Sequence, residues 1–334
     1  MLAIVLQAVI RVGSRALRSR TLVAIAVLAF IAIFLLRWPF PLIILTAAVA
    51  GFVGVRLGVP GLQVGGHAGA GAGLADADSL LGEALPDHAR PSVGTALSIA
   101  AVWLVLWLVP VALLIGLLGP ADTFTRIALF FSQLAMVTFG GAYAVLAWVA
   151  QAAVEQFGWV SAGEMLDGLG MAETTPGPLI MVTQFVGFLA AWRDPGSLHP
   201  LVAGTLGGLL TTWVTFVPCF LWIFLGAPFV ETLRNHAALR GALSAVTAAV
   251  VGVILNLGLW FALHTGFQRT ETWHGPGITV DIPVWASASF WAIGLALTAT
   301  VAVFRFRAGI LATLAASAAA GVALQFAGVL PAGG

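Results

Sequence analysis

Two short polar stretches interrupt apolar parts of the chain, and their residues have the chemistry of an anion-binding site. The first stretch covers residues 139–143 and the second covers residues 173–178. Proline inside a helix removes a backbone donor and clashes with the preceding turn. A half-helix that begins near Pro178 would therefore present free N–H groups and a positive dipole end, which together suit an oxyanion. The hydroxyl groups of Thr174 and Thr175 would add two donors.

Each stretch also has a plainer explanation, which the residues alone leave open. The Pro176-Gly177-Pro178 run would also suit a kinked helix or a surface loop. The paired glycines Gly140 and Gly141 resemble helix-packing contacts, the commoner use of glycine in membrane helices. Tyr143, the single tyrosine of the chain, either hydrogen-bonds a substrate oxygen or anchors the chain at an interface. The neighbouring Glu173, Asp167 and Gln184 favour a functional interpretation, because polar groups within a membrane span are rare and usually functional. Gln184 is therefore counted among the expected substrate-binding residues.

Two carboxyl groups near the second stretch are candidate proton carriers. A carboxyl group removed from water favours its neutral form and then exchanges protons near neutral pH. Glu173 is the stronger candidate because it adjoins the Pro-Gly-Pro run. Asp167 is either a second proton carrier or an ordinary solvated acid near the membrane surface. Glu155 and Glu164 are interpreted as surface acids.

The composition places these stretches in a membrane protein. The chain is 60% hydrophobic and 8% charged, whereas soluble domains carry about 25% charged residues. Long apolar runs without a period of two predict an all-α polytopic membrane protein. About nine hydrophobic segments are expected, including broken or re-entrant helices at the two polar stretches. The segments lie at residues 21–36, 40–57, 95–118, 124–151, 164–191, 200–226, 242–265, 284–304 and 307–329.

The loop arginines predict the orientation of these segments. With a cytoplasmic N-terminus, ten arginines fall in inside loops and four in outside loops, and Arg37 is among the four. This asymmetry follows the positive-inside rule. If the segment at 164–191 is re-entrant, it does not cross the membrane, and every later segment has the opposite orientation. The single cysteine, Cys219, excludes an intrachain disulfide, and the acid pair at Asp76 and Asp78 lacks a third ligand. No metal site and no cofactor are therefore expected.

Several motifs together resemble the second half of a chromate ion transporter. The resemblance implies proton-motive-force-linked export of chromate, an oxyanion similar to sulfate. It also implies that Phe139, Gly140, Gly141 and Tyr143 bind the substrate together with residues 173–178. The matching residues are 139–146, 158–161, 164–170, 172–178, 183–187, 212–219 and 249–256.

Long-chain members of that family carry two homologous halves of opposite orientation, and each half has its own Phe-Gly-Gly and Pro-Gly-Pro elements. This chain has one copy of each element. Residues 1–57 are interpreted as the closing helices of a first half, residues 58–93 as a flexible Gly/Ala/Asp-rich linker, and residues 94–334 as the second half. Inverted-repeat transporters form their site between the halves. We therefore expect a partner half, either a second copy in a homodimer or a separate first-half subunit.

Three functions remain in consideration. The leading hypothesis is a secondary transporter of chromate, or of a similar tetrahedral oxyanion such as sulfate, with several passes through the plasma (inner) membrane. The second is a non-transporting or incomplete membrane subunit. The third is a membrane-embedded enzyme acting on a lipid phosphate, which is disfavoured because the acids are dispersed along the chain. The expected partners are the oxyanion and the lipid bilayer, with no nucleic acid.

Overall fold

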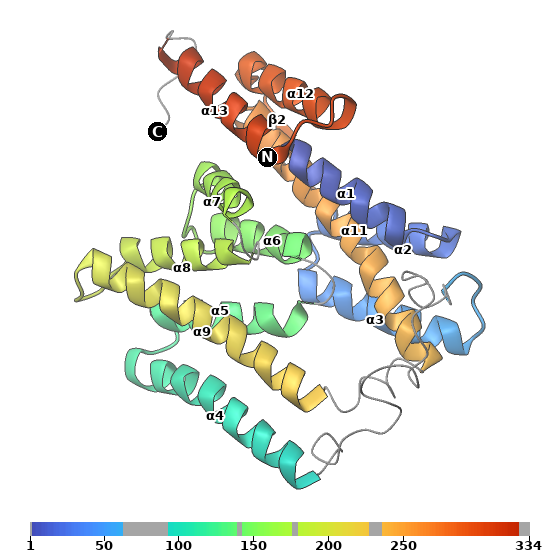
Figure 1. The fold of residues 1–334 in the computed structure, drawn as a ribbon, viewed down its shortest axis with the longest axis vertical. Helices are drawn as coiled ribbons and strands as arrows, with labels where there is room; N and C mark the ends of the chain where they lie inside the picture. Colours follow the sequence, from blue (N-terminus) through green and yellow to red (C-terminus); the bar gives the residue numbers. More distant parts are fainter. Residues whose placement is uncertain (1, 63–92, 139–141, 176–179, 227–235, 327–334) are drawn as a thin grey trace, which may run out of the picture. The chain divides into compact units, whose positions relative to one another are not determined.

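The computed structural model describes residues 2–62, 93–138, 142–175, 180–226 and 236–326 (Figure 1). These residues are predominantly helical, which confirms the prediction of an all-α membrane protein. The predicted linker lies mostly outside the described residues. The helices are α1 (Leu2–Ala16), α2 (Arg20–Phe34), α3 (Phe40–Arg56), α4 (Val93–Leu118), α5 (Thr123–Val137), α6 (Ala142–Gln151), α7 (Ala162–Thr174), α8 (Met181–Arg193), α9 (Pro200–Gly226), α11 (Ala237–Gly266), α12 (Phe290–Arg305) and α13 (Ile310–Phe326).

The chain forms two compact units, each assembled from separated parts of the sequence. The first unit comprises Met1–Thr46, Phe139–Val186 and Thr247–Gly334. The second comprises Ala47–Thr138 and Gly187–Val246. The division predicted above, at residues 57 and 93, concerns two homologous halves and stays a prediction.

Three of the described helices are long and apolar enough to cross a membrane, namely Gly94–Leu118, Pro200–Gly226 and Ala237–Gly266. In the apolar part of Gly94–Leu118 only 11% is buried inside the protein, against 61% in that of Ala237–Gly266. The α4 helix thus exposes most of its apolar surface, which suits contact with lipid. Shorter apolar helices are α2, α3, α5, α12 and α13.

The predicted interruptions fall between helices. The expected segment 124–151 consists of α5, which ends at Val137, and α6, which begins at Ala142. The expected segment 164–191 consists of α7, which ends at Thr174, and α8, which begins at Met181. The residues between α5 and α6, and most of those between α7 and α8, lie outside the described part of the chain.

A β-hairpin precedes α12, where the sequence predicted a loop. Strand β1 (Thr270–Gly275) pairs antiparallel with strand β2 (Ile278–Pro283). Alternating β-branched residues favour strands here, and Pro276 with Gly277 closes a two-residue turn. Gly277 has φ +74°, the left-handed value that the third position of a type II turn requires. The helix expected from residue 284 consequently begins at Phe290.

Close helix contacts organise the second unit. The α9 helix packs against α4 and α5. Trp107 of α4 donates its indole N–H to the hydroxyl of Ser132 in α5 at 3.0 Å, and this bond is buried. Gly187 of α8 lies against α9, where an added Cβ would clash with the Thr211 hydroxyl and stand 3.1 Å from the Gly207 carbonyl oxygen. Glycine at this crossing is required by space.

The α11 helix supplies much of the core of the first unit. Gly252 lies so close to α2 that a Cβ would clash with the Ala26 carbonyl and the Phe30 backbone nitrogen. Just after α2, the Leu35 carbonyl accepts from the Thr279 N–H of β2 at 3.0 Å, which holds the hairpin to this end of the helix. The fully or almost fully buried side chains of α11 here are Ala248, Ala249, Val250, Val253, Ile254, Leu257 and Phe261.

Candidate functional site

A hydrogen bond joins the flanks of the two polar stretches. Tyr143, in the first turn of α6, donates its phenol O–H to Oε1 of Glu173 in the last turn of α7, at 2.6 Å. Both side chains are half-buried, and the distance is typical of a hydroxyl bound to a carboxylate. We call these residues the Tyr143–Glu173 pair. Tyr143 follows residues 139–141 closely and Glu173 precedes Pro176 closely, so the pair connects one stretch to the other.

Local sequence fixes both ends of α7. At its start, the Ser161 hydroxyl accepts from the Glu164 N–H at 3.2 Å, and Oε2 of Glu164 accepts from the Ser161 N–H at 2.8 Å. This is a capping box, so Glu164 has a structural role. At its end, Thr175 is extended (φ −92°, ψ 128°) and its N–H donates to the Met171 carbonyl at 3.0 Å. A residue before proline avoids the helical region, which ends α7 just after Glu173.

The other predicted site residues are distributed as follows. The Thr175 hydroxyl donates to the Met171 carbonyl at 2.8 Å. Asp167 and Gln184 are exposed on α7 and α8, and neither bonds to the Tyr143–Glu173 pair among the described residues. Thr174 is the last residue of α7. Six predicted ligands lie outside the described residues, namely Phe139, Gly140, Gly141, Pro176, Gly177 and Pro178.

Arg11 is a residue near the pair that sequence reasoning did not assign to a site. It lies on α1, and its positive charge acts on the Tyr143 phenol. The predicted ligands contain no cation, although a dianion gains most from a guanidinium. The sequence shows Arg11 within a run of N-terminal arginines, but nothing in its spacing points to Tyr143.

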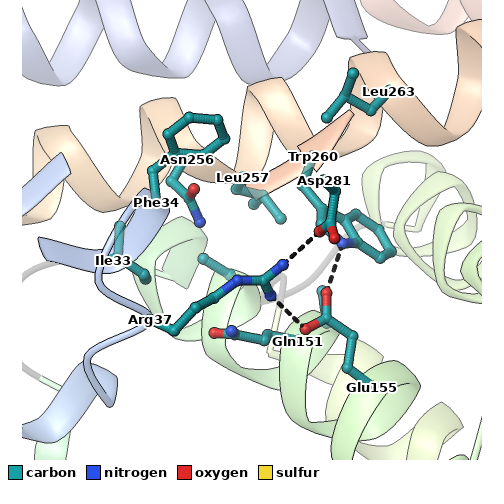
Figure 2. A pocket seen from close by; sticks show the side chains of 12 residues that line it. Ile33, Phe34, Arg37, Gln151, Glu155, Asn256, Leu257, Trp260, Leu263 and Asp281 are labelled. Carbon is teal, nitrogen blue, oxygen red and sulfur yellow. Dashed lines mark hydrogen bonds and ion pairs between the residues drawn. The ribbon is translucent and has the colours of Figure 1, made fainter. Parts of the chain in front are cut away.

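A second polar cluster lies in the same unit (Figure 2). Arg37 donates from Nη1 to Oε2 of Glu155 at 2.8 Å and from Nη2 to Oδ2 of Asp281 at 2.5 Å. Trp260 donates its indole N–H to Oε1 of Glu155 at 2.9 Å. We call these four residues the Arg37 cluster. The Arg37, Glu155 and Asp281 side chains are 27%, 32% and 17% exposed, so water screens their charges only in part.

Two irregular pieces of backbone and one strand position this cluster. Arg37 follows α2 with φ +52°, a left-handed conformation that is unusual for a residue other than glycine. Glu155 lies in the π-helical turn η3 (Ala152–Gln156), which continues α6. Asp281 lies in β2, and its Oδ1 accepts from the Thr272 hydroxyl of β1 at 2.8 Å. π-Helical turns occur frequently at functional sites.

A small cavity borders the Arg37 cluster. Its volume is about 30 Å³, enough for one or two water molecules. Gln151 of α6 and Asn256 of α11 line it with the cluster (Figure 2). Within the described ranges their side-chain amides form no hydrogen bond to protein, so they are available to water or to a proton donor. The remaining lining residues are Ile33, Phe34, Ala147, Ala150, Leu257 and Leu263.

The sequence reasoning missed the Arg37 cluster. Arg37 was expected in an outside loop and Glu155 as a surface acid. Glu155 is exposed, as expected, and the structure adds its ion pair with Arg37. The sequence separation of 118 residues hides this pairing. The available signal was weak: Arg37 stands in a tight corner before Trp38 and Pro39, and Asn256 is a polar residue inside an apolar run.

The apolar helices are interrupted at two polar stretches, and a half-buried polar pair connects these stretches. Such interruptions are a feature of membrane transport proteins. Residues 125–322 match the chromate transporter family. This match covers more than half of the 334 residues, and the chain belongs to the chromate transporter family. No solved structure matches the chain.

Three curated relatives illustrate the similarity. A probable chromate transport protein of Synechococcus elongatus is 31% identical over 137 residues, which are 40% of this chain and 32% of that protein. A chromate transport protein of Cupriavidus metallidurans is 28% identical over 130 residues, 39% of this chain and 29% of its own length. One of Pseudomonas aeruginosa is 29% identical over 194 residues, 58% of this chain and 42% of its own length. The chain thus spans less than half the length of each.

Proposed function

We propose that this chain transports chromate, or a similar tetrahedral oxyanion such as sulfate, as a multi-pass protein of the plasma (inner) membrane. The proposed reaction is export linked to the proton-motive force, with no chemical change to the anion. Family membership and the names of the three curated relatives support the substrate. The apolar helices support transport across a membrane.

The Tyr143–Glu173 pair is the observation that carries this proposal. Its hydrogen bond unites the flanks of two stretches that lie about thirty residues apart. The plainer explanations, a packing glycine pair and an unrelated loop, do not require the two stretches to meet. A shared site does require it. We therefore place the anion beside this pair, with the free N–H groups expected near Pro178 as donors.

The proposed roles of the residues at this site follow from their charges. Glu173 is the proposed proton carrier, because the charge of its carboxylate opposes an anion beside it and protonation removes that charge. Tyr143 holds Glu173 in place and can turn its phenol O–H to a substrate oxygen. Arg11, whose charge acts only weakly on the Tyr143 phenol, is the candidate source of positive charge for the dianion. Asp167 is proposed as a more exposed stage of the proton route.

A second half is part of the proposed transport unit. Transporters of this class form the site between repeats, and the chain spans less than half the length of its curated relatives. The second half is contributed by a homodimer partner or by a first-half subunit. Cross-linking in the membrane, followed by mass determination of the product, separates these two sources.

Transport by inverted membrane vesicles tests the proposal. Vesicles from cells producing the protein are expected to accumulate radiolabelled chromate when energised, and excess sulfate is expected to compete. Tyr143→Phe and Glu173→Gln should each lower the rate at least tenfold, the loss expected for one charged hydrogen bond. Glu271→Gln removes an exposed acid in β1 and should leave the rate unchanged. Full transport by both site variants would contradict the proposed site. It would favour the second hypothesis, in which this chain is a non-transporting subunit and another chain carries the anion site.

A further inference from the structure

The Arg37 cluster contains one more negative charge than positive charges. Arg37 is the one cation, and it is shared between Glu155 and Asp281. Two titratable groups among the described residues lie beside the cluster. The Nδ1 of His274, in β1, is 3.4 Å from the hydroxyl of Thr279, on the strand that carries Asp281. The ring of His264 lies 4.0 Å from the Trp260 ring, centroid to centroid. Its Nδ1 is within hydrogen-bond distance of the Trp260 carbonyl, at 2.9 Å. A partly buried site with an uncompensated negative charge attracts one positive charge.

We propose that the Arg37 cluster binds one proton, which Glu155 takes up, and that this proton couples the cluster to the transport site. The coupling role rests on the proposed function, whereas proton binding by the cluster does not. When Glu155 is neutral, Arg37 and Asp281 remain as a balanced one-to-one ion pair.

The geometry selects Glu155 over Asp281 as the acceptor. Asp281 is the less exposed of the two, and both of its oxygens are engaged, by Arg37 and by the Thr272 hydroxyl. Glu155 borders the cavity, and Gln151 stands about one helical turn earlier on the same helix. A protonated Glu155 becomes a donor. The side-chain carbonyl oxygens of Gln151 and Asn256, which accept no hydrogen bond from the part of the chain that the structure describes, are acceptors in the same cavity.

The cavity fits a proton route better than an anion site. Its volume of about 30 Å³ leaves room for one or two water molecules, which is enough to deliver a proton to Glu155. The negative charge of the cluster also opposes a dianion.

One helix connects the proton site with the Tyr143–Glu173 pair. Tyr143 lies in the first turn of α6, and Glu155 lies in the π-helical turn η3 that continues it. Twelve residues separate them, roughly 18 Å along a helix. Protonation of Glu155 removes its ion pair with Arg37 and so releases η3, while the Thr279 bond still holds the hairpin to the end of α2. Both sites can thus bias one rigid element, which is the physical requirement for coupling.

Infrared difference spectroscopy on the purified protein in lipid vesicles tests proton uptake without transport. Acidification is expected to produce the carbonyl band of a protonated carboxylic acid, and Glu155→Gln is expected to lose that component. The matched control Glu271→Gln should retain it. An undiminished band in Glu155→Gln would overturn the proposal. If Na⁺ stabilised the cluster and pH had no effect, the bound cation would be a sodium ion, and the proposal of a proton would be overturned.

Hydrogen exchange provides the second readout, because it follows the release of η3. Protection factors of residues 152–156 should fall roughly two- to fivefold on acidification, the factor that a partly exposed ion pair supports. Glu155→Gln should show low protection at every pH. Trp260→Phe keeps the acid but removes the indole N–H that Glu155 accepts at 2.9 Å, so this variant should keep the pH response and show lower overall protection of residues 152–156. An identical pH response in all three proteins would refute the release.

These outcomes distinguish the proposal from the proposed function. An infrared band that depends on Glu155, in a protein that moves no chromate or sulfate, supports the proton site and removes the transport proposal. Transport that keeps its wild-type dependence on the pH gradient in Glu155→Gln supports the function and overturns the coupling role of the Arg37 cluster.

Discussion

The Tyr143–Glu173 hydrogen bond predicts a measurable coupling energy between two side chains. Tyr143→Phe retains the ring and its packing but removes the O–H that Glu173 accepts at 2.6 Å. Glu173→Gln retains the shape but removes the charge. A hydrogen bond to a charged group contributes about 1.5–3 kcal/mol. Because both side chains are half-buried, water replaces part of this bond in each single variant. We therefore expect a coupling energy of about 1–2 kcal/mol.

A double-mutant cycle measures this energy directly. The free energy of unfolding is determined for the wild type, both single variants and the double variant, by reversible chemical unfolding in mixed micelles. The double variant should be more stable than the sum of the single losses predicts. A control cycle that combines Tyr143→Phe with Glu271→Gln should be additive to within about 0.5 kcal/mol. Coupling below about 0.3 kcal/mol between Tyr143 and Glu173 would refute the hydrogen bond, and with it the link between the polar stretches.

Two further perturbations test the packing and the ion pairs. Gly187→Ala should lower the free energy of unfolding by about 1–3 kcal/mol, because the added Cβ clashes with the Thr211 hydroxyl. Gly294→Ala, where the new Cβ meets nothing within 4 Å, should be neutral or stabilising, and a similar loss in both variants would contradict the steric argument. Arg37→Gln should cost about 0.5–2 kcal/mol, less at high salt. Arg307→Gln has the same left-handed backbone (φ +52°) without an ion pair among the described residues, and should change stability by less than about 0.5 kcal/mol; equal losses would exclude the ion pairs as the cause.

Much of the helical fold was predictable because apolar runs carry a strong signal. The run expected at residues 200–226 is α9 with the same bounds, and the predicted interruptions fall between α5 and α6 and between α7 and α8. Proline marks the second interruption through the extended backbone of Thr175. The hairpin was missed because its strands are short and lie in a loop. Single-chain patterns identify long apolar helices more reliably than short alternating strands.

The candidate site was predictable only in part. Tyr143 and Glu173 were singled out as unusual residues in apolar surroundings, and their contact depends on the fold. The Arg37 cluster was not predictable, because its members come from a helix end, a π-helical turn and a hairpin. Each of these residues has an ordinary surface explanation when it is considered alone. Charged pairs distant in sequence become visible only when the backbone is placed.

The π-helical turn makes the phase of one helix depend on a single residue. In η3, the Phe157 N–H donates five residues back, to the Ala152 carbonyl at 2.8 Å, so this turn holds one residue more than an α-helical turn. Each residue of an α-helix rotates the chain by about 100°. An extra residue in a regular α-helix would rotate all later residues by that angle, whereas the wider turn of η3 takes up most of this rotation. Helical phase, as well as residue identity, therefore determines whether the ionic contact at one end of this helix and the polar contact at the other can form together.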